Sequence, residues 1–380
     1  MHIVFERCCK IVPFKLVEGD KIMKEPVLYS DALENIASDE EKVHQGLARE
    51  FHKIITATHR DNGWADRGVH AKSHALLEGT IQIHDDLPDV LAQGLFAQPG
   101  EHSVIIRISS IPGDPLDDAV SGPRGFALKI NDVKGELLPD NEGVPVQDLL
   151  LVNGPVFAAP DSRHFLRTLR LLALTTDRFN GFKKLLSRSL RVLQKQLNRF
   201  GKSNDMIGVL GGYLPTVPVG DRFFSQVPLR FGKYVAKFDI VPSSESFRRQ
   251  RGMLIDIDKN PVAIRQKLNH FFSEHGGEWT LRAQLCRDLK ENPIEDASKV
   301  WSEDDNPFLP LATIKVPPQD SWSKERAERL EDGLSFSPWH GLTAHRPLGD
   351  IMRARRAMYP FSSRLRTRLN GCPLHFRVSG

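Results

Sequence analysis

The sequence predicts an α+β protein whose core is an antiparallel β-sheet or barrel, and three observations lead to this fold class. Short apolar runs bounded by turn-forming residues fill residues 66–155, and similar runs return at 227–242 and 278–288. Helical patterns stand before these runs and between the two β-rich stretches. Many short strands joined by turns favour an antiparallel sheet or barrel over a doubly wound parallel sheet.

Residues 28–58 are predicted to be mainly helical. After Ser38 and Asp39, apolar residues recur at helical spacing and acidic residues fill the first turn. The apolar positions are Val43, Leu47, Phe51 and Ile54 or Ile55. Strands are then predicted at SVIIRISS (103–110), GFALKIND (125–132) and DLLLVNGPV (148–156), with PGD, GPRG and GEL as turn signals.

Residues 161–203 are predicted to form a helical insertion between the two β-rich stretches. Apolar residues recur there at spacings of three and four, at Phe182, Leu186, Leu190, Leu193, Leu197 and Phe200. From Arg178 to Lys202 the segment has eight basic residues and no acidic one. Two interpretations remain open: a helix that packs on the core with a solvated basic face, or one that contacts a lipid or membrane surface.

Composition and charge set limits on the function. The 380 residues are 40% hydrophobic and 26% charged, as in ordinary globular proteins, and the net charge of +4 argues against a nucleic-acid binder. The four cysteines form no CxxC pair, which favours a reducing compartment. The N-terminus lacks the unbroken apolar core of a signal peptide, and no window approaches the ~20 apolar residues of a membrane span. We therefore expect a soluble cytoplasmic protein.

The motif RGVHAKSH (67–74) gathers basic side chains just before the predicted strand LLEGTIQIH (76–84). It fits a basic surface loop, a zinc site on His70 and His74, or the polar wall of a buried pocket. The spacing of His70 and His74 suits two ligands on a helix, but the motif lacks the Glu of HExxH and enters a strand. Zinc is therefore disfavoured, and the absence of GxSxG argues against a serine hydrolase of the elbow type.

The C-terminal region contains a second chemical signal. Arg355 precedes Tyr359 by four residues, so the two side chains would share one face of a helix. A guanidinium within hydrogen-bond distance stabilises a phenolate, and a ferric ion stabilises it more strongly. This spacing therefore suits an anionic oxygen ligand for iron, although a tyrosine that packs on an amphipathic helix has the same pattern.

Seven segments in one order resemble the haem catalase superfamily. They are RGVHAKSH, VIIRISS (104–110), GPRGFALKI (122–130), LLLVNGPVF (149–157), EWTLRAQL (278–285), NPIEDASKVW (292–301) and RARRAMYPFSSRLR (353–366). The resemblance covers about residues 60–370 and implies a closed antiparallel barrel at 61–320 that carries the insertion 161–203. An N-terminal arm and helix (1–60) would precede the barrel. A wrapping segment with the proximal haem-ligand helix (321–380) would follow it.

The resemblance also implies roles for individual residues around haem b. His70 would be the distal histidine with Asn153 as its distal partner, and Ser109 would hydrogen-bond the far side of the imidazole. Tyr359 would be the proximal iron ligand, as in catalases, with Arg355 holding its phenolate. The positions that meet the haem propionates are Arg67, Arg107 and Arg366.

The implied activity is cleavage of organic hydroperoxides, hydrogen peroxide or both through a ferryl intermediate, with a small organic electron donor. An alternative is a fatty-acid hydroperoxide lyase or isomerase of the allene-oxide-synthase type, which needs no donor; a third is a non-enzymatic haem-binding protein. Val69 favours the first, since the allene-oxide-synthase branch has threonine before the distal histidine. The basic segment 178–202 favours the second, since a fatty-acid hydroperoxide carries a carboxylate and an apolar tail.

The chain departs from true catalases in its length. The parts associated with the interlocked tetramer and the NADPH pocket are reduced or missing. We therefore expect a homodimer or another small homo-oligomer, and no bound NADPH.

Overall fold

The computed structural model describes residues 23–113, 115–141, 143–175, 213–258 and 260–371. The described strands are β1 (Ser73–Ile83), β2 (Gly100–Ser110), β3 (Arg124–Ile130), β4 (Gln147–Val152), β5 (Phe223–Phe224), β6 (Leu229–Phe231), β7 (Tyr234–Pro242), β8 (Gly277–Leu285) and β9 (Leu309–Val316). The α-helices are α1 (Glu40–Asn62), α2 (Ser162–Thr175), α5 (Glu245–Arg248), α6 (Ala263–Glu274), α7 (Lys324–Ala327) and α8 (Asp350–Asn370). Shorter turns are η1 (Asp31–Leu33), η2 (Gly94–Phe96), η3 (Pro139–Asn141), η4 (Pro218–Gly220), η5 (Glu328–Asp332) and η6 (Thr343–His345).

The strands form a closed antiparallel barrel. Their order is β5-β4-β3-β2-β1-β9-β8-β7-β6, and β5 pairs with β7 as well as with β4. That second pairing closes a ring of β1 to β5 and β7 to β9, while β6 pairs with β7 beside the ring. The predicted fold class, an α+β protein with a closed antiparallel barrel, is confirmed.

Alternate residues of the strands fill one continuous core, because successive side chains of a strand point to opposite faces. Ile106 of β2, Leu128 of β3 and Phe238 of β7 belong to this core and are fully buried. The ring of Phe126 meets that of Trp279 edge-on, with centroids 5.3 Å apart. The barrel interior is therefore packed with side chains.

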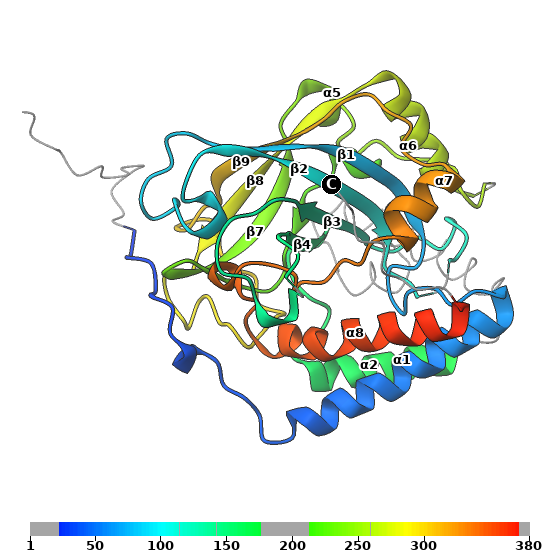
Figure 1. Ribbon diagram of the computed structural model, residues 1–380, viewed down its shortest axis with the longest axis horizontal. Helices are drawn as coiled ribbons and strands as arrows, with labels where there is room; N and C mark the ends of the chain where they lie inside the picture. The colour runs from blue at the N-terminus through cyan, green and yellow to red at the C-terminus, as the bar shows by residue number, and fades with distance from the viewer. Residues whose placement is uncertain (1–22, 114, 142, 176–212, 259, 372–380) are drawn as a thin grey trace, which may run out of the picture.

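Three helices pack together on one side of the barrel, where α8 runs alongside α1 and α2 (Figure 1). Their shared apolar cluster consists of Val43, Leu47, Phe51, Leu166, Leu169, Ala354 and Met358. Three of the positions predicted for the first helix are therefore in this cluster, and Ile55 is also fully buried. No helix in the described ranges is long and apolar enough to cross a bilayer.

Two predicted helical regions match the described helices only in part. The first helix begins at Glu40 rather than near residue 28, and the chain before it is mostly extended, with one short turn at η1. The predicted insertion at 161–203 begins with α2, but the basic segment 178–202 lies outside the described residues.

Candidate functional site

His70 lies just before β1 in a strained backbone conformation. Its φ of 56° is in the left-handed region, which residues other than glycine rarely adopt. The backbone is held on both sides: its N–H donates to Ile111 O at 2.7 Å, and its carbonyl accepts from Arg107 Nη2 at 2.7 Å. A conformation this uncommon persists where the surroundings enforce it, and such residues concentrate at functional sites.

The His70 imidazole is neutral and paired. Its Nδ1 lies 3.1 Å from Ser109 Oγ on β2, so the structure places these two predicted site residues in contact. Burial, with smaller contributions in the same direction from the charges of Arg107, Arg355 and Arg67, lowers the pKa of His70 to about 3. The ring is therefore uncharged at neutral pH, and one of its two nitrogens can accept a proton.

Gly125 lies on β3, between the two strands that lead to Ser109 and Asn153. It pairs with Ser109 of β2 on one side and with Val152 of β4 on the other. Asn153 follows Val152 directly, so Ser109 and Asn153 lie on either side of Gly125. The sequence analysis did not single out Gly125, although it lies inside the segment GPRGFALKI.

The Asn153 side chain is fixed by two hydrogen bonds. Its Oδ1 accepts from the backbone N–H of Arg124 at 2.7 Å, and its Nδ2 donates to Asp221 Oδ2 at 2.7 Å. Asp221 also accepts from Thr216 Oγ1 at 3.0 Å. Asp221 was not predicted from the sequence, because it follows a glycine-rich region without a recognisable motif.

Tyr359 and Arg355 lie on α8, as the spacing predicted, with Pro360 inside the same helix. Burial raises the pKa of the Tyr359 phenol, and Arg355 and Arg67 only partly offset this effect. The Arg355 guanidinium contacts Met352 Sδ at 3.9 Å and lies 5.4 Å from the centroid of the Phe157 ring. The charge of Arg355 lowers the pKa of the phenol, which is the direction expected from the sequence, although the effect of burial is larger.

His70 and Tyr359 come from opposite ends of the chain and share one electrostatic environment. The same three guanidiniums, those of Arg67, Arg107 and Arg355, lower the pKa of His70 and oppose the rise at Tyr359. Coulombic interactions between charged groups weaken with distance, so the three guanidiniums lie in the neighbourhood of both rings. The fold therefore brings the predicted distal and proximal side chains around one cluster of cations.

The predicted propionate arginines already bind a carboxylate. Arg67 Nη1 donates to Glu331 Oε1 at 3.1 Å, and Arg107 Nε donates to the same oxygen at 2.9 Å. Arg366, on α8, is buried. Sequence reasoning missed Glu331, because nothing in its local pattern indicates a partner more than 200 residues away.

The remaining basic residues of the RGVHAKSH motif are also buried. Lys72 Nζ pairs with Asp118 Oδ1 at 2.6 Å, which excludes a solvated surface loop at this position. His74 lies in β1, with Nε2 2.6 Å from Ser110 Oγ. In the described part of the chain, a group of side chains that could hold a metal ion is found at Glu40, His44 and Asp350; it includes neither His70 nor His74.

Val69 packs against the apolar cluster shared by α1, α2 and α8. It is partly buried, and it precedes His70 directly. The loop that carries the imidazole is therefore fixed to the helical layer that carries Tyr359.

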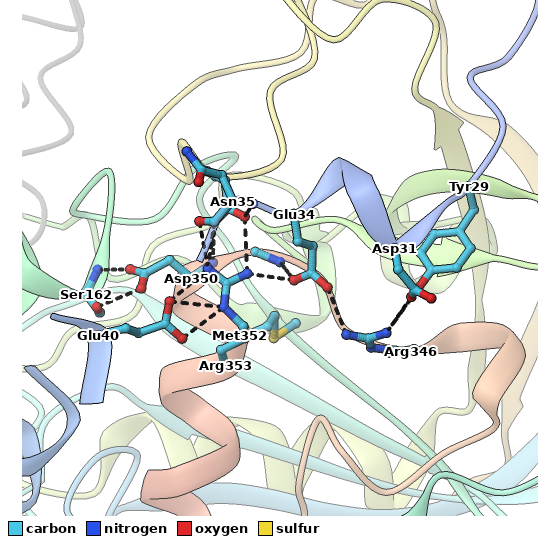
Figure 2. Close-up of polar contacts among 12 residues, drawn as sticks. Tyr29, Asp31, Glu34, Asn35, Glu40, Ser162, Arg346, Asp350, Met352 and Arg353 are labelled. Carbon is cyan, nitrogen blue, oxygen red and sulfur yellow. Dashed lines mark hydrogen bonds and ion pairs between the residues drawn. The ribbon is translucent and has the colours of Figure 1, made fainter. Parts of the chain in front are cut away.

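The N-terminal end of α8 is anchored by a cluster of carboxylates (Figure 2). Arg353 Nη1 donates to Glu34 Oε1 at 2.7 Å, and Arg353 Nε donates to Glu40 Oε1 at 2.9 Å. A third carboxylate, Glu295, accepts from Arg353 Nη2 at 3.1 Å. Arg346 extends the cluster to Glu34 at 2.9 Å. These ion pairs fix the extended N-terminal arm to the helix that presents Tyr359.

Comparison with known proteins defines the class of fold. No protein-family model matches the chain, and no curated protein matches it significantly. Solved catalases do match: a fungal catalase (TM-score 0.57, 17% identity, 84% of this chain and 63% of that chain) and catalase A from Saccharomyces cerevisiae (0.58, 15%, 94% and 71%). A bacterial catalase matches with a TM-score of 0.56 at 16% identity, over 91% of this chain and 64% of that one.

The protein thus has a catalase-like fold. The identities of 15–17% are too low to carry more than the fold. The chain spans less than two thirds of the length of the fungal and bacterial catalases it matches.

Proposed function

We propose that the protein is a haem-dependent peroxide-cleaving enzyme, a catalase-like peroxidase acting on organic hydroperoxides, hydrogen peroxide or both. The observation that carries the proposal is the neutral His70 imidazole, paired with Ser109 at 3.1 Å, in the same arginine environment as Tyr359. A general base and a potential oxygen ligand for iron are thus combined on a catalase-like barrel.

The side chains suit haem b. Tyr359 offers a phenolic oxygen of the kind that ligates iron in catalases. Arg67 and Arg107 bind the carboxylate of Glu331, so their donor geometry also suits a propionate. When bound, haem b supplies a ferric ion that can cleave the O–O bond. Ligation of iron requires that Tyr359 lose its phenolic proton. Burial raises the pKa of Tyr359 and opposes this loss, whereas the charge of Arg355 lowers the pKa and favours it.

His70 would move the peroxide proton. Because Nδ1 faces Ser109 Oγ, Nε2 is the ring nitrogen left to accept that proton. The low pKa of the imidazole then favours return of the proton to the departing oxygen. Positioned acid–base transfer of this kind contributes about a hundredfold or more.

Asn153 would orient the peroxide. One hydrogen of its Nδ2 is donated to Asp221, and the amide carries a second one that can be donated to a peroxide oxygen. A side chain held at both ends of its amide loses little freedom when it binds substrate.

The other sequence predictions stay predictions. They include a small organic electron donor, a small homo-oligomer, a cytoplasmic location and lipid contact through 178–202. The lipid-hydroperoxide lyase or isomerase and the non-enzymatic haem-binding protein are alternative outcomes of the following test.

The test combines spectroscopy with two substrates. The purified protein is titrated with hemin, and oxygen release from hydrogen peroxide is compared with consumption of linoleic-acid hydroperoxide, with and without guaiacol. We expect a high-spin ferric spectrum with guaiacol oxidation or oxygen release. Donor-independent conversion of the lipid would favour the isomerase, and hemin binding without turnover would favour the non-enzymatic protein.

Two substitutions assign the roles. Tyr359→Phe should lose or greatly weaken hemin binding, whereas Tyr234→Phe in β7 should bind hemin as the parent protein does. His70→Ala should keep hemin and lose about a hundredfold in peroxide cleavage. An unchanged Soret band in Tyr359→Phe would remove Tyr359 from the proximal role.

A further inference from the structure

Glu331 is held at the arginine pair by every polar atom of its side chain. Its Oε1 accepts from Arg67 Nη1 at 3.1 Å and from Arg107 Nε at 2.9 Å, and its Oε2 accepts from Ser73 Oγ at 2.6 Å. Arg67 Nη2 also donates to the backbone carbonyl of Glu331 at 2.6 Å. The carboxylate is thus bound as a ligand carboxylate would be.

The cluster is mostly shielded from water. The side chains of Arg107, Glu331 and Arg67 are 3%, 12% and 18% exposed. Burial alone would raise the pKa of Glu331, but Arg107 and Arg67, together with the hydrogen bond from Ser73, more than offset this effect, so the pKa is lowered and the carboxylate is ionised. Removal of one partner from a buried ion pair leaves the other charge uncompensated and destabilises the fold.

A second carboxylate at the same guanidiniums would compete with Glu331. Like charges that share a buried site repel each other, and a guanidinium has a fixed set of donors. Arg67 Nη1 and Arg107 Nε already donate to Glu331 Oε1, so a propionate that binds to these donors meets an occupied site. A ligand with two carboxylates therefore forms hydrogen bonds to Arg67 Nη1 and Arg107 Nε only after the Glu331 carboxylate has moved away from them.

The segment that carries Glu331 is a single short turn. Residues Glu328–Asp332 form one π-helical turn, an arrangement that often marks functional positions. Within it Glu328 and Arg329 are exposed, and Leu330 is the residue that packs inward beside Glu331. The turn lies outside the barrel strands, so its movement would leave their pairing intact.

We propose that Glu331 is an internal counterion that occupies the carboxylate site of Arg67 and Arg107 and must be displaced by a haem propionate. The inference rests on the proposed function and adds a property of this chain: a built-in competitor of its own cofactor. Glu331 stabilises the haem-free protein and lowers haem affinity below what the arginine pair could provide.

The test measures binding rather than turnover. Hemin is titrated into the parent protein, Glu331→Gln and the matched control Glu328→Gln, which loses the same charge at an exposed position of the same turn. Glu331→Gln should bind hemin about tenfold more tightly or better, because a charge-assisted competitor is removed. Glu328→Gln should bind as the parent does. Haem-free Glu331→Gln should also unfold at a lower temperature.

Hemin dimethyl ester separates the cause from a general loosening of the site. It lacks the propionate charges, so Glu331→Gln should give it no gain in affinity. If Glu331→Gln fails to fold, Glu331→Asp, which keeps the charge on a shorter side chain, should show a smaller gain for hemin.

Each contrary outcome points to one hypothesis. If the parent binds hemin and Glu331→Gln binds it equally or less tightly, the competition is refuted and the proposed function stands. An equal gain for the ester also refutes it. If neither protein binds hemin, the proposed function itself fails.

Discussion

The imidazole of His70 lies directly against the backbone of Gly125. A Cβ at position 125 would lie 2.4 Å from His70 Cε1, 2.5 Å from its Nδ1 and 3.1 Å from Ser109 Oγ. Gly125→Ala should therefore push the ring away from Ser109 and lower peroxide cleavage at least tenfold, with hemin binding retained. Stopped-flow turnover and the Soret titration measure the two effects separately.

The control lies three residues earlier in the same segment. A Cβ at Gly122 meets no atom within 4 Å, so Gly122→Ala should match the parent protein. Equal losses in both variants would mean that the segment tolerates no side chain for reasons unrelated to His70.

Asp221 is predicted to act through Asn153 rather than on the substrate. Asp221→Ala removes the acceptor of the Asn153 Nδ2 hydrogen bond of 2.7 Å, so the amide loses its fixed orientation. We expect peroxide cleavage to fall about tenfold or more, with hemin affinity unchanged. Asp221→Asn keeps an acceptor oxygen and should restore most of the activity. A loss as large in Asp221→Asn would argue for the charge of Asp221 instead of its hydrogen bond.

The fold was largely predictable because it follows from local patterns. Short apolar runs at 103–110 and 125–132, bounded by turn-forming residues, predict strands, and β2 and β3 lie there. The same reasoning placed Arg355 and Tyr359 on one helix face. Closure of the barrel was implied by the resemblance to catalases and not by local patterns. That the closure runs through the two-residue strand β5 was not predicted, because it depends on long-range pairing.

The candidate site was predictable only in part, because much of it depends on pairs that are distant in sequence. Glu331 meets Arg67 across 264 residues, and Asp221 meets Asn153 across 68. No periodicity encodes such pairs. The residues before Glu40 were expected to be mainly helical, but Glu34 there pairs with Arg353, which holds the arm extended across the start of α8. The burial of Tyr359, which raises the pKa of its phenol against the charge of Arg355, is likewise a property of the folded chain.

Arg353 is predicted to be a major contributor to stability. It is 11% exposed and compensates the carboxylates of Glu34, Glu40 and Glu295 (Figure 2). Arg353→Ala should lower the free energy of unfolding by about 3–5 kcal/mol, since it removes the arginine that the buried Glu40 shares with Glu295. Glu34, in contrast, keeps its pair with Arg346. Urea unfolding monitored by tryptophan fluorescence measures the change.

Arg356, three residues after Arg353 on the same helix, provides the comparison. Its side chain is 50% exposed and pairs with Asp140, so Arg356→Ala should cost less than about 1 kcal/mol. Similar losses for Arg353→Ala and Arg356→Ala would show that the carboxylate cluster does not anchor α8.

Buried histidines predict a loss of stability in mild acid. Burial lowers the pKa of His345 to about 4, below its unfolded value near 6.5, and its Nε2 accepts a hydrogen bond from Leu95 N–H at 2.9 Å. Between these two pH values the unfolded chain binds one more proton at His345 than the folded chain. The contribution is therefore fully present above about pH 6.5 and is lost as the pH falls toward 4.

His345→Gln tests this linkage, because its amide oxygen can still accept from Leu95 N–H while the titration is removed. The slope of unfolding free energy against pH between 4.5 and 6 should decrease by up to about 1.4 kcal/mol per pH unit. His70 and His74, whose pKa values burial also lowers, keep the remaining slope above zero. An unaltered slope in His345→Gln would mean that position 345 binds the same number of protons in the folded and unfolded chains.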